Sequence, residues 1–332
     1  MTSSAPPVLV IGEALTDILC GPDGSRSARP GGSPANVALG LARLGHPVRL
    51  ATRVGQDGNG AALRRHLLDS GVELTHGSVV PGASPTATAV LDEHGSATYT
   101  FDLHWDIPPS TLALVRDGAP GHLHTGSIAT ALEPGARHVE AAVRAARDAT
   151  TISYDPNLRP SLLGDAAEER PRVEAFVASS DVVKASEEDL AWLYPERKPE
   201  EVAARWASSG PSLVVLTRGA DSTGAFWRVG RCEVPVPKVR VVDTVGAGDA
   251  FMAGLISGLL SAGMLGSLPA GAEPSPRTRL RAATGAQALD AAVAAALARA
   301  SLAAALTCGR PGADPPTLAE LTDRQTAVPP VG

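Results

Sequence analysis

The chain has 332 residues, with 29 Lys and Arg against 35 Asp and Glu, and a formal net charge of −6. This acidic balance argues against a nucleic-acid-binding protein, which needs a basic surface to neutralise phosphates. A hydrophobic content of 44% with 19% charged residues is typical of a globular chain and excludes wholesale disorder.

From residue 8 onwards, strand-like and helix-like segments alternate along the chain. Residues 34–44 carry apolar side chains at helical spacing, with Pro34 in the opening turn and Gly45 after the last turn. Such alternation predicts a mostly parallel sheet with helices on both faces, a doubly wound α/β fold. The expected strands are 8–12, 47–54, 122–125, 151–155, 182–184 and 213–217, with a hairpin at 225–227 and 231–234. The expected helices are 34–44, 60–69, 134–148, 168–178, 200–208, 250–262 and 281–307.

Two further strand-like runs, at residues 86–92 and 97–103, flank Glu93-His94-Gly95 and predict a hairpin. An isolated hairpin is marginally stable, so this one must pack on a cleft, a partner subunit or both. We expect one domain over residues 1–316, with a small β lid from strands near 13–30 and 84–105. Residues 317–332 are expected to be a partly disordered tail.

Cysteine content and the N-terminus predict a cytoplasmic protein. Three cysteines, none in a C-x-x-C pair, are too few for a disulfide framework, and no basic segment precedes an apolar one at the N-terminus. Residues 286–307 are long and apolar, yet they include Asp290 and Arg299. Each charge would cost about 2.5–3.5 kcal/mol at the centre of a membrane, so we expect a buried helix there.

The most informative segment is the Gly-rich turn from Asp243 to Asp249 (Asp-Thr-Val-Gly-Ala-Gly-Asp). A short apolar strand is expected to end at Asp243 and a helix to begin near Asp249. The backbone N–H groups of Gly246, Ala247 and Gly248 would then point to one spot beside a helix N-terminus, which is an anion site. Asp249 has two interpretations: it accepts a proton from an attacking hydroxyl, or it only caps the helix.

A second Gly-rich segment, Gly31-Gly32-Ser-Pro-Ala-Asn36, precedes the first helix. The two glycines permit close approach to a polar ligand, and the Asn36 amide can both donate and accept; the alternative is an ordinary loop and helix cap.

Other nucleotide-binding motifs are not found in the sequence. The chain has no P-loop and no protein-kinase motifs, and Phe251 stands where a dinucleotide fingerprint needs its third Gly or Ala.

Together these two segments resemble the N- and C-terminal signatures of the PfkB (ribokinase-like) carbohydrate kinases. The similarity runs from about residue 8 to residue 316, with further blocks in the family's order at 12–13, 55–58, 155–159, 184–189 and 217–221. The resemblance implies a ribokinase-like fold and ATP-dependent phosphorylation of a sugar hydroxyl. Positioning and charge stabilisation dominate that chemistry.

The resemblance also implies roles for individual residues. Asp249 would be the general base, and the backbone of Val245–Gly248 would stabilise the migrating phosphoryl group. The positions that match the sugar site are Asp17, Gly31, Gly32 and Asn36, although Asp17 could instead lie in a surface turn. Arg159 could contact a substrate or phosphate oxygen, or form a helix-capping salt bridge.

On the nucleotide side, Lys184 and the segment Ser186-Glu-Glu-Asp189 match a block near the phosphates and Mg²⁺. This sequence departs from the common Asn-x-x-Glu pattern, so either Glu187 or Asp189 could hold a Mg²⁺-bound water. The loop beside the adenine and phosphates would comprise Thr217, Arg218, Gly219 and Asp221. The resemblance also implies a monovalent-cation site, for K⁺, at Asp243 and Val245 with residues 305–309.

The blocks at 125–130, 155–159 and 310–316 look most like the fructokinase branch of this family. We therefore expect D-fructose as the acceptor and ATP as the donor, with 2-keto-3-deoxygluconate as the alternative acceptor. That sugar acid needs a cation for its carboxylate, and Arg159 is the only obvious one. A sugar sensor that binds without transfer is the other alternative. The expected partners are small molecules and a second copy of the chain through the lid, with no nucleic acid and no membrane.

Overall fold

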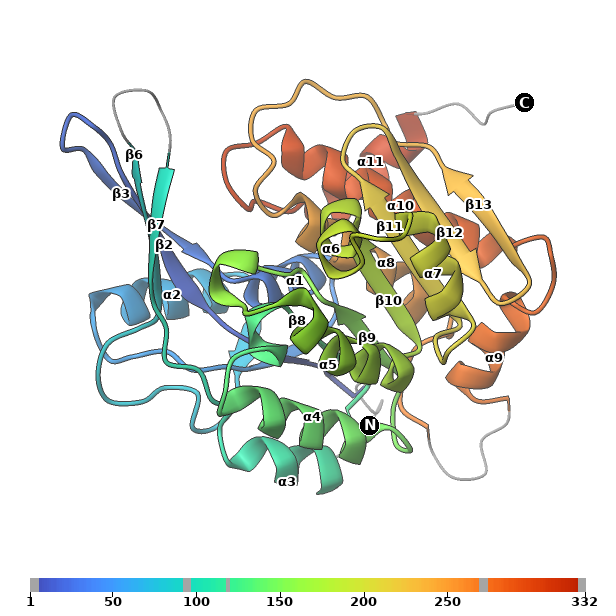
Figure 1. Cartoon of the computed structure of the whole chain (residues 1–332), viewed down its shortest axis with the longest axis horizontal. Helices are drawn as coiled ribbons and strands as arrows, with labels where there is room; N and C mark the ends of the chain where they lie inside the picture. The colour runs from blue at the N-terminus through green and yellow to red at the C-terminus, as the bar shows by residue number, and fades with distance from the viewer. Residues whose placement is uncertain (1–5, 92–96, 118–119, 269–273, 328–332) are drawn as a thin grey trace.

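The structure is a computed structural model that describes residues 6–91, 97–117, 120–268 and 274–327. Its main sheet has nine strands in the order β13-β12-β11-β10-β9-β8-β1-β4-β5 (Figure 1). Neighbours from β11 to β5 pair in parallel, whereas β12 and β13 add an antiparallel hairpin at one edge. The predicted mostly parallel sheet is thus confirmed. The strands are β1 (Val8–Ile11), β4 (Val48–Ala51), β5 (Val72–Leu74), β8 (His122–Gly126), β9 (Ile152–Asp155), β10 (Val182–Ser186), β11 (Leu213–Arg218), β12 (Ser222–Trp227) and β13 (Gly230–Val234).

Helices cover both faces of this sheet because successive strand side chains point to opposite sides. Val8 and Val10 of β1 belong to one apolar core, whereas Leu9 and Ile11 belong to the other. The first core is covered by α1 (Ser33–Arg43), α2 (Gly58–Asp69), α8 (Ala247–Ser261), α9 (Pro276–Ala283) and α10 (Ala291–Cys308). The second is covered by α3 (Ser110–Asp117), α4 (Gly135–Ala146), α5 (Ala166–Ser179), α6 (Glu187–Leu193) and α7 (Pro199–Ala207).

A separate four-stranded sheet, which we call the lid, lies at the left in Figure 1 and has the order β3-β2-β6-β7. Its strands are β2 (Leu15–Cys20), β3 (Arg26–Gly31), β6 (Thr86–Leu91) and β7 (Ala97–Asp102). The antiparallel β6–β7 pair confirms the predicted hairpin, whose turn at residues 93–95 lies outside the described residues. Leu15 and Ala87 of the lid pack on Ile128 and Leu162, from the short 3₁₀ helices η1 (Ser127–Thr130) and η2 (Pro160–Leu162). The lid therefore rests on the loops that follow β8 and β9.

At three segments the structure replaces the expected element or tail with a different arrangement. The single helix expected over 281–307 is two helices, because α9 ends before Gly285 and Asp290 begins α10 by accepting from Ala292 N at 2.8 Å. The strand expected at 241–243 does not form, because the N–H groups of Val242 and Asp243 donate to the Cys308 carbonyl instead. Within the expected tail, Leu318–Ala327 is a helix, α11, whose Leu321 is buried against the main body.

Helix α10 is long and apolar enough to cross a membrane by length and composition alone. It packs along α8 in the core instead, as the sequence predicted. The contact is close because α8 presents Gly254 and Gly258, where a Cβ would come within 2.9 Å of Ala300 Cα and 2.7 Å of Ala296 Cα. A core helix of this composition needs no membrane to bury its side chains.

Candidate functional site

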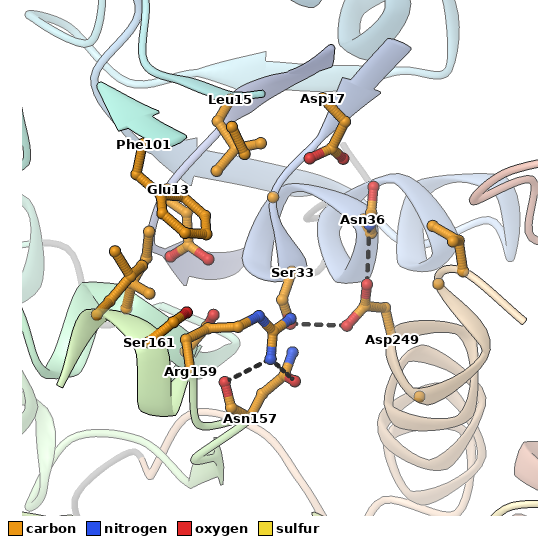
Figure 2. Close-up of a pocket in the computed structure, with 18 of the residues that line it drawn as sticks. Glu13, Leu15, Asp17, Ser33, Asn36, Phe101, Asn157, Arg159, Ser161 and Asp249 are labelled. Carbon is orange, nitrogen blue, oxygen red and sulfur yellow. Dashed lines mark hydrogen bonds between the residues drawn. The ribbon is translucent and has the colours of Figure 1, made fainter. Parts of the chain in front are cut away.

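A cavity of about 520 Å³ lies under the lid, where the strands β1, β8 and β9 end (Figure 2). The carboxyl ends of parallel strands are the usual place for ligands in open α/β sheets. Five residues expected in the sugar site come from four separate segments and all line this cavity: Asp17, Gly32, Asn36, Arg159 and Asp249. Gly31 does not line it but lies directly behind the Asp17 carboxylate.

Asp249 is held from the opposite wall, by the start of α1. Its Oδ1 accepts from Ser33 Oγ at 2.7 Å and its Oδ2 accepts from Asn36 Nδ2 at 2.8 Å (Figure 2). The N-cap of α8 is Gly246, and no side chain caps that helix end. The helix-cap interpretation of Asp249 is therefore wrong. Its side chain is buried at 8% exposure, yet it faces the cavity, so it is positioned to meet a ligand hydroxyl.

Two glycines, one before α1 and one before α8, set the backbone conformation near Asp249. Gly32 has φ 101° and Gly246 has φ 75°, backbone angles that residues other than glycine rarely adopt. A Cβ on Gly32 would come within 2.5 Å of the Glu13 carbonyl, and one on Gly246 within 2.5 Å of Ala313 Cβ. Val245, Gly246 and Gly248 consequently line the cavity at the N-terminus of α8, where backbone N–H groups favour an anion.

A second cavity of about 660 Å³ adjoins the first. Its walls are mostly apolar, from the segment 236–241 and from α10, and its polar side chains include Ser186, Glu188 and Thr217. Cavities of this size with an apolar wall and a few polar groups suit a cofactor-sized ligand. Four residues line both cavities and mark their junction: Asn157, Lys184, Thr244 and Gly248.

Several residues matched to the nucleotide or metal sites line neither cavity. Arg218 is held by Glu200 at 2.8 Å and by Ser222 at 2.8 Å, and Asp221 is exposed in the following turn. Glu187 is exposed outside the cavities. Asp189 is buried and forms a capping box with Ser186, while its other oxygen accepts from Leu158 N at 2.6 Å. Both carboxylate oxygens of Asp189 therefore already accept hydrogen bonds from the protein.

Asp243 and Arg159 are both engaged by neighbouring backbone. The Asp243 carboxylate accepts from Val245 N at 3.0 Å and Gly312 N at 2.7 Å, and Arg29 of the lid lies 3.9 Å away. These backbone hydrogen bonds hold the pKa of Asp243 below its ordinary value. Arg159 Nη1 donates to both oxygens of Asn157 and to the Leu158 carbonyl. Arg159 precedes η2 without a side-chain cap, and it forms no salt bridge among the described residues, so the alternative of a helix-capping ion pair finds no support there.

Lys184 lies at the junction and forms a buried ion pair that the sequence did not reveal. Its Nζ lies 2.8 Å from Asp155 Oδ2, and both side chains are at most 5% exposed. Burial alone would lower the pKa of the Lys184 ammonium, but the carboxylates of Asp155, Asp189 and Asp249 raise it above the ordinary value. The ammonium therefore keeps its charge at neutral pH.

Glu13 is the main cavity residue that sequence reasoning missed. It follows β1 directly, is 3% exposed, and has Oε2 3.3 Å from the Ala129 N–H. Burial raises its pKa to about 7 and the nearby Asp249 adds to this, while hydrogen bonds and Arg159 oppose it. Asp17 is reachable by solvent, but the surrounding walls and Asp249 raise its pKa to about 6. For Glu13, the signal available in the sequence was a carboxyl residue placed directly after a buried first strand.

Replacing Glu13 with Gln is expected to stabilise the protein at pH 8 and not at pH 4.5. The raised pKa means that the folded state binds a proton that the unfolded state releases, so the unfolding free energy falls as pH rises from about 4.5 through about 7. Gln removes this loss, worth on the order of 3 kcal/mol. Thermal melts at both pH values measure it, and equal Tm values for the two proteins at pH 8 would contradict the assignment.

Comparison with known proteins connects this geometry to a family. Residues 7–320 match the family described as pfkB family carbohydrate kinase. A fructokinase from Klebsiella pneumoniae is 36% identical over 272 residues, covering 79% of this chain and 87% of that protein. A fructokinase from Rhizobium leguminosarum bv. trifolii is 34% identical over 263 residues, covering 76% of this chain and 79% of that protein.

Solved structures agree. A fructokinase from Vibrio cholerae O395 with bound fructose, ADP and calcium ion superposes with a TM-score of 0.73 at 28% identity, covering 97% of this chain and 99% of that one. An ATP-bound fructokinase from Xylella fastidiosa, 24% identical with a TM-score of 0.79 and the same coverage, supports the ribokinase-like fold. The chain belongs to the pfkB family of carbohydrate kinases and is an ATP-dependent sugar kinase that transfers a phosphoryl group to an alcohol.

Proposed function

We propose that the protein phosphorylates D-fructose with ATP, producing D-fructose 6-phosphate and ADP. The observation that carries this proposal is the position of Asp249, in the first cavity and beside Gly248, which lines both cavities. Relatives named fructokinase support the choice of sugar. The test is ADP release with fructose, ribose, 2-keto-3-deoxygluconate and adenosine as acceptors, and we expect fructose to have the highest kcat/KM. Release with none of them would support the sugar-sensor alternative.

The two cavities would hold the two substrates on either side of Asp249. The sugar would occupy the first cavity, where Asp17, Asn36 and the Gly32 backbone can hydrogen-bond its hydroxyl groups. The nucleotide would occupy the second, with its base on the apolar wall and its phosphates toward Thr217, Gly219 and the α8 N-terminus.

Asp249 would act as the general base. Its two hydrogen bonds aim the carboxylate at an acceptor hydroxyl, from which it takes a proton while that oxygen attacks the terminal phosphorus. The N–H groups from Val245 to Gly248 would stabilise the charge on the phosphoryl oxygens during transfer. Closure of the lid over the sugar would exclude water that otherwise hydrolyses ATP.

The charges in the sugar cavity favour a neutral acceptor over a sugar acid. Glu13, Asp17 and Asp249 place three carboxyl groups around it, and Lys184 is already paired with Asp155. Arg159 is the remaining cation, and its Nη1 is held by three oxygens of its own loop. A substrate carboxylate would therefore meet more repulsion than attraction. This supports fructose over 2-keto-3-deoxygluconate.

Replacing Arg159 with Gln should lower kcat/KM for fructose and for a sugar acid by the same factor. We expect a higher apparent KM for ATP or a lower kcat, because the guanidinium would then serve the phosphates or the loop. A charged hydrogen bond to a substrate carboxylate is worth about 1.5–3 kcal/mol, so its loss would instead appear as a selective fall of tenfold or more for the acid. That selective fall, with poor turnover of fructose by the wild type, would favour the sugar-acid kinase.

The metal ion would be Mg²⁺, which nucleotide enzymes hold through substrate phosphates and one or two carboxylates. The acidic segment at residues 187–189, part of which lines the nucleotide cavity, fits this mode. Glu187 and Asp189 remain the proposed water-mediated ligands, and Glu188, which lines the nucleotide cavity, is a third.

K⁺ would bind near Asp243 and Val245. Its effect is measured by comparing rates in K⁺ and Na⁺, and we expect faster turnover in K⁺.

We also propose that the lid forms a homodimer contact. Leu19 is 43% exposed on β2, and β3 and β7 are the edge strands of the lid sheet among the described residues. Sedimentation at micromolar concentration should give a dimer for the wild type and a monomer for Leu19→Glu. A monomeric wild type would overturn this contact without affecting the kinase assignment.

A cytoplasmic location remains a prediction, and cell fractionation would test it.

A further inference from the structure

We infer that Asp155 is a positioning residue that holds Lys184 against the phosphoryl group in transfer, which makes Lys184 a catalytic residue. The inference rests on the proposed function, because it assigns both residues a part in the kinase reaction. Lys184 lines the sugar cavity and the nucleotide cavity alike. A Cβ on Gly248 would lie 3.0 Å from Lys184 Nζ, so the ammonium borders the N-terminal turn of α8. A phosphoryl group that is transferred between the cavities would lie near this ammonium.

The structure fixes the Lys184 ammonium in place. Lys184 is in the middle of β10, with backbone pairing to β11, and it is 4% exposed. Asp155, the last residue of β9, holds Nζ at 2.8 Å. A flexible lysine on the surface would have to be ordered for each turnover, whereas this one is already oriented when the substrates bind.

Asp155 differs from a carboxylate that serves only the fold. Its Oδ1 is buried and has no hydrogen-bond partner among the residues that the structure describes. Asp181, equally buried at the other end of β10, provides a contrast: its oxygens accept from Ile152 N and from Arg147 and Arg277. A buried oxygen without a partner destabilises the fold, so a functional reason for keeping Asp155 is expected.

The chemistry of transfer requires a cation at this point. The acceptor hydroxyl gives its proton to Asp249, its oxygen forms a bond to the γ-phosphorus, and the bond from that phosphorus to the bridging oxygen breaks, leaving the electron pair on ADP. Charge spreads over the three equatorial oxygens in the transition state. The Lys184 ammonium, which keeps its protons throughout, stabilises that charge more than it stabilises either bound substrate.

A mutant cycle tests the inference: Lys184→Met, Asp155→Asn and the double variant. We expect each single variant to lower kcat about 10²-fold or more, with KM for ATP and for the sugar changed less than about threefold. Because Asp155 acts through Lys184, the double variant should be no slower than Lys184→Met. Asp181→Asn is the matched control; it should lower Tm and leave kcat unchanged.

Three results would overturn the inference. They are a kcat for Asp155→Asn within about threefold of the wild type, losses that multiply in the double variant, or a rise in the KM for ATP that accounts for the whole effect of Lys184→Met. If Asp155→Asn does not fold, Asp155→Glu keeps the charge, moves it by one methylene and is judged by the same criteria. If the wild type prefers a sugar other than fructose, the cycle is run with that sugar, so failure of the proposed substrate is distinguished from failure of the inference.

Discussion

Replacing Asp249 with Asn is expected to lower kcat at least about 10²-fold, the usual effect of losing a general base. Binding of ATP and fructose should change little, because Asn has the same shape. Its Oδ1 can still accept from Ser33, and the Asn36 amide can turn over to accept from the new Nδ2. What disappears is the group that takes the proton. The measurements are steady-state turnover and calorimetric titration of both ligands.

Ser33→Ala is the matched control for Asp249→Asn. It removes one of the two hydrogen bonds that aim the carboxylate but leaves the base itself. We expect a loss of less than about tenfold, since a single hydrogen bond contributes about 1 kcal/mol. Normal turnover by a correctly folded Asp249→Asn protein would refute the assignment of the base.

Replacing Asp17 with Asn should raise the KM for fructose about tenfold or more and leave nucleotide binding nearly unchanged. Asp17 projects from the lid strand β2 into the sugar cavity and lines no part of the nucleotide cavity (Figure 2). A hydrogen bond from a sugar hydroxyl to a charged acceptor is worth about 1.5–3 kcal/mol, which sets the size of the effect. Asp23→Asn is the control, because Asp23 lies in the exposed turn between β2 and β3 and accepts a hydrogen bond from Ser25 N, away from the sugar cavity.

The pH dependence of fructose use gives a second measurement for Asp17. Because its pKa is raised to about 6, Asp17 gains a proton as the pH falls through 6 and loses its charged acceptor. The value of kcat/KM for fructose should therefore decline from pH 7.5 to pH 5, and part of this decline should be absent in Asp17→Asn. A profile that the substitution does not alter would separate Asp17 from sugar binding.

Local sequence patterns determined the architecture and the two Gly-rich segments. Alternation of strands and helices is a property of neighbouring residues, and it correctly indicated the parallel sheet, the β6–β7 hairpin and the buried α10. Local features explain one error, because Gly285 and Asp290 interrupt an otherwise helical apolar run. The missing strand at 241–243 has a non-local cause, because the carbonyl that replaces strand pairing belongs to Cys308, more than sixty positions away.

The arrangement of the site was decided by the tertiary structure. Asp249 could be a helix cap or a base until Ser33 and Asn36, more than two hundred residues earlier, were found on its two oxygens. The pairing of Lys184 with Asp155 and the burial of Glu13 in the cavity were likewise not evident from the sequence. The physical reason is common to all three. Parallel strands bring their carboxyl ends to one edge of the sheet whatever their order in the chain, and the burial and charge created at that edge depend on every segment that ends there.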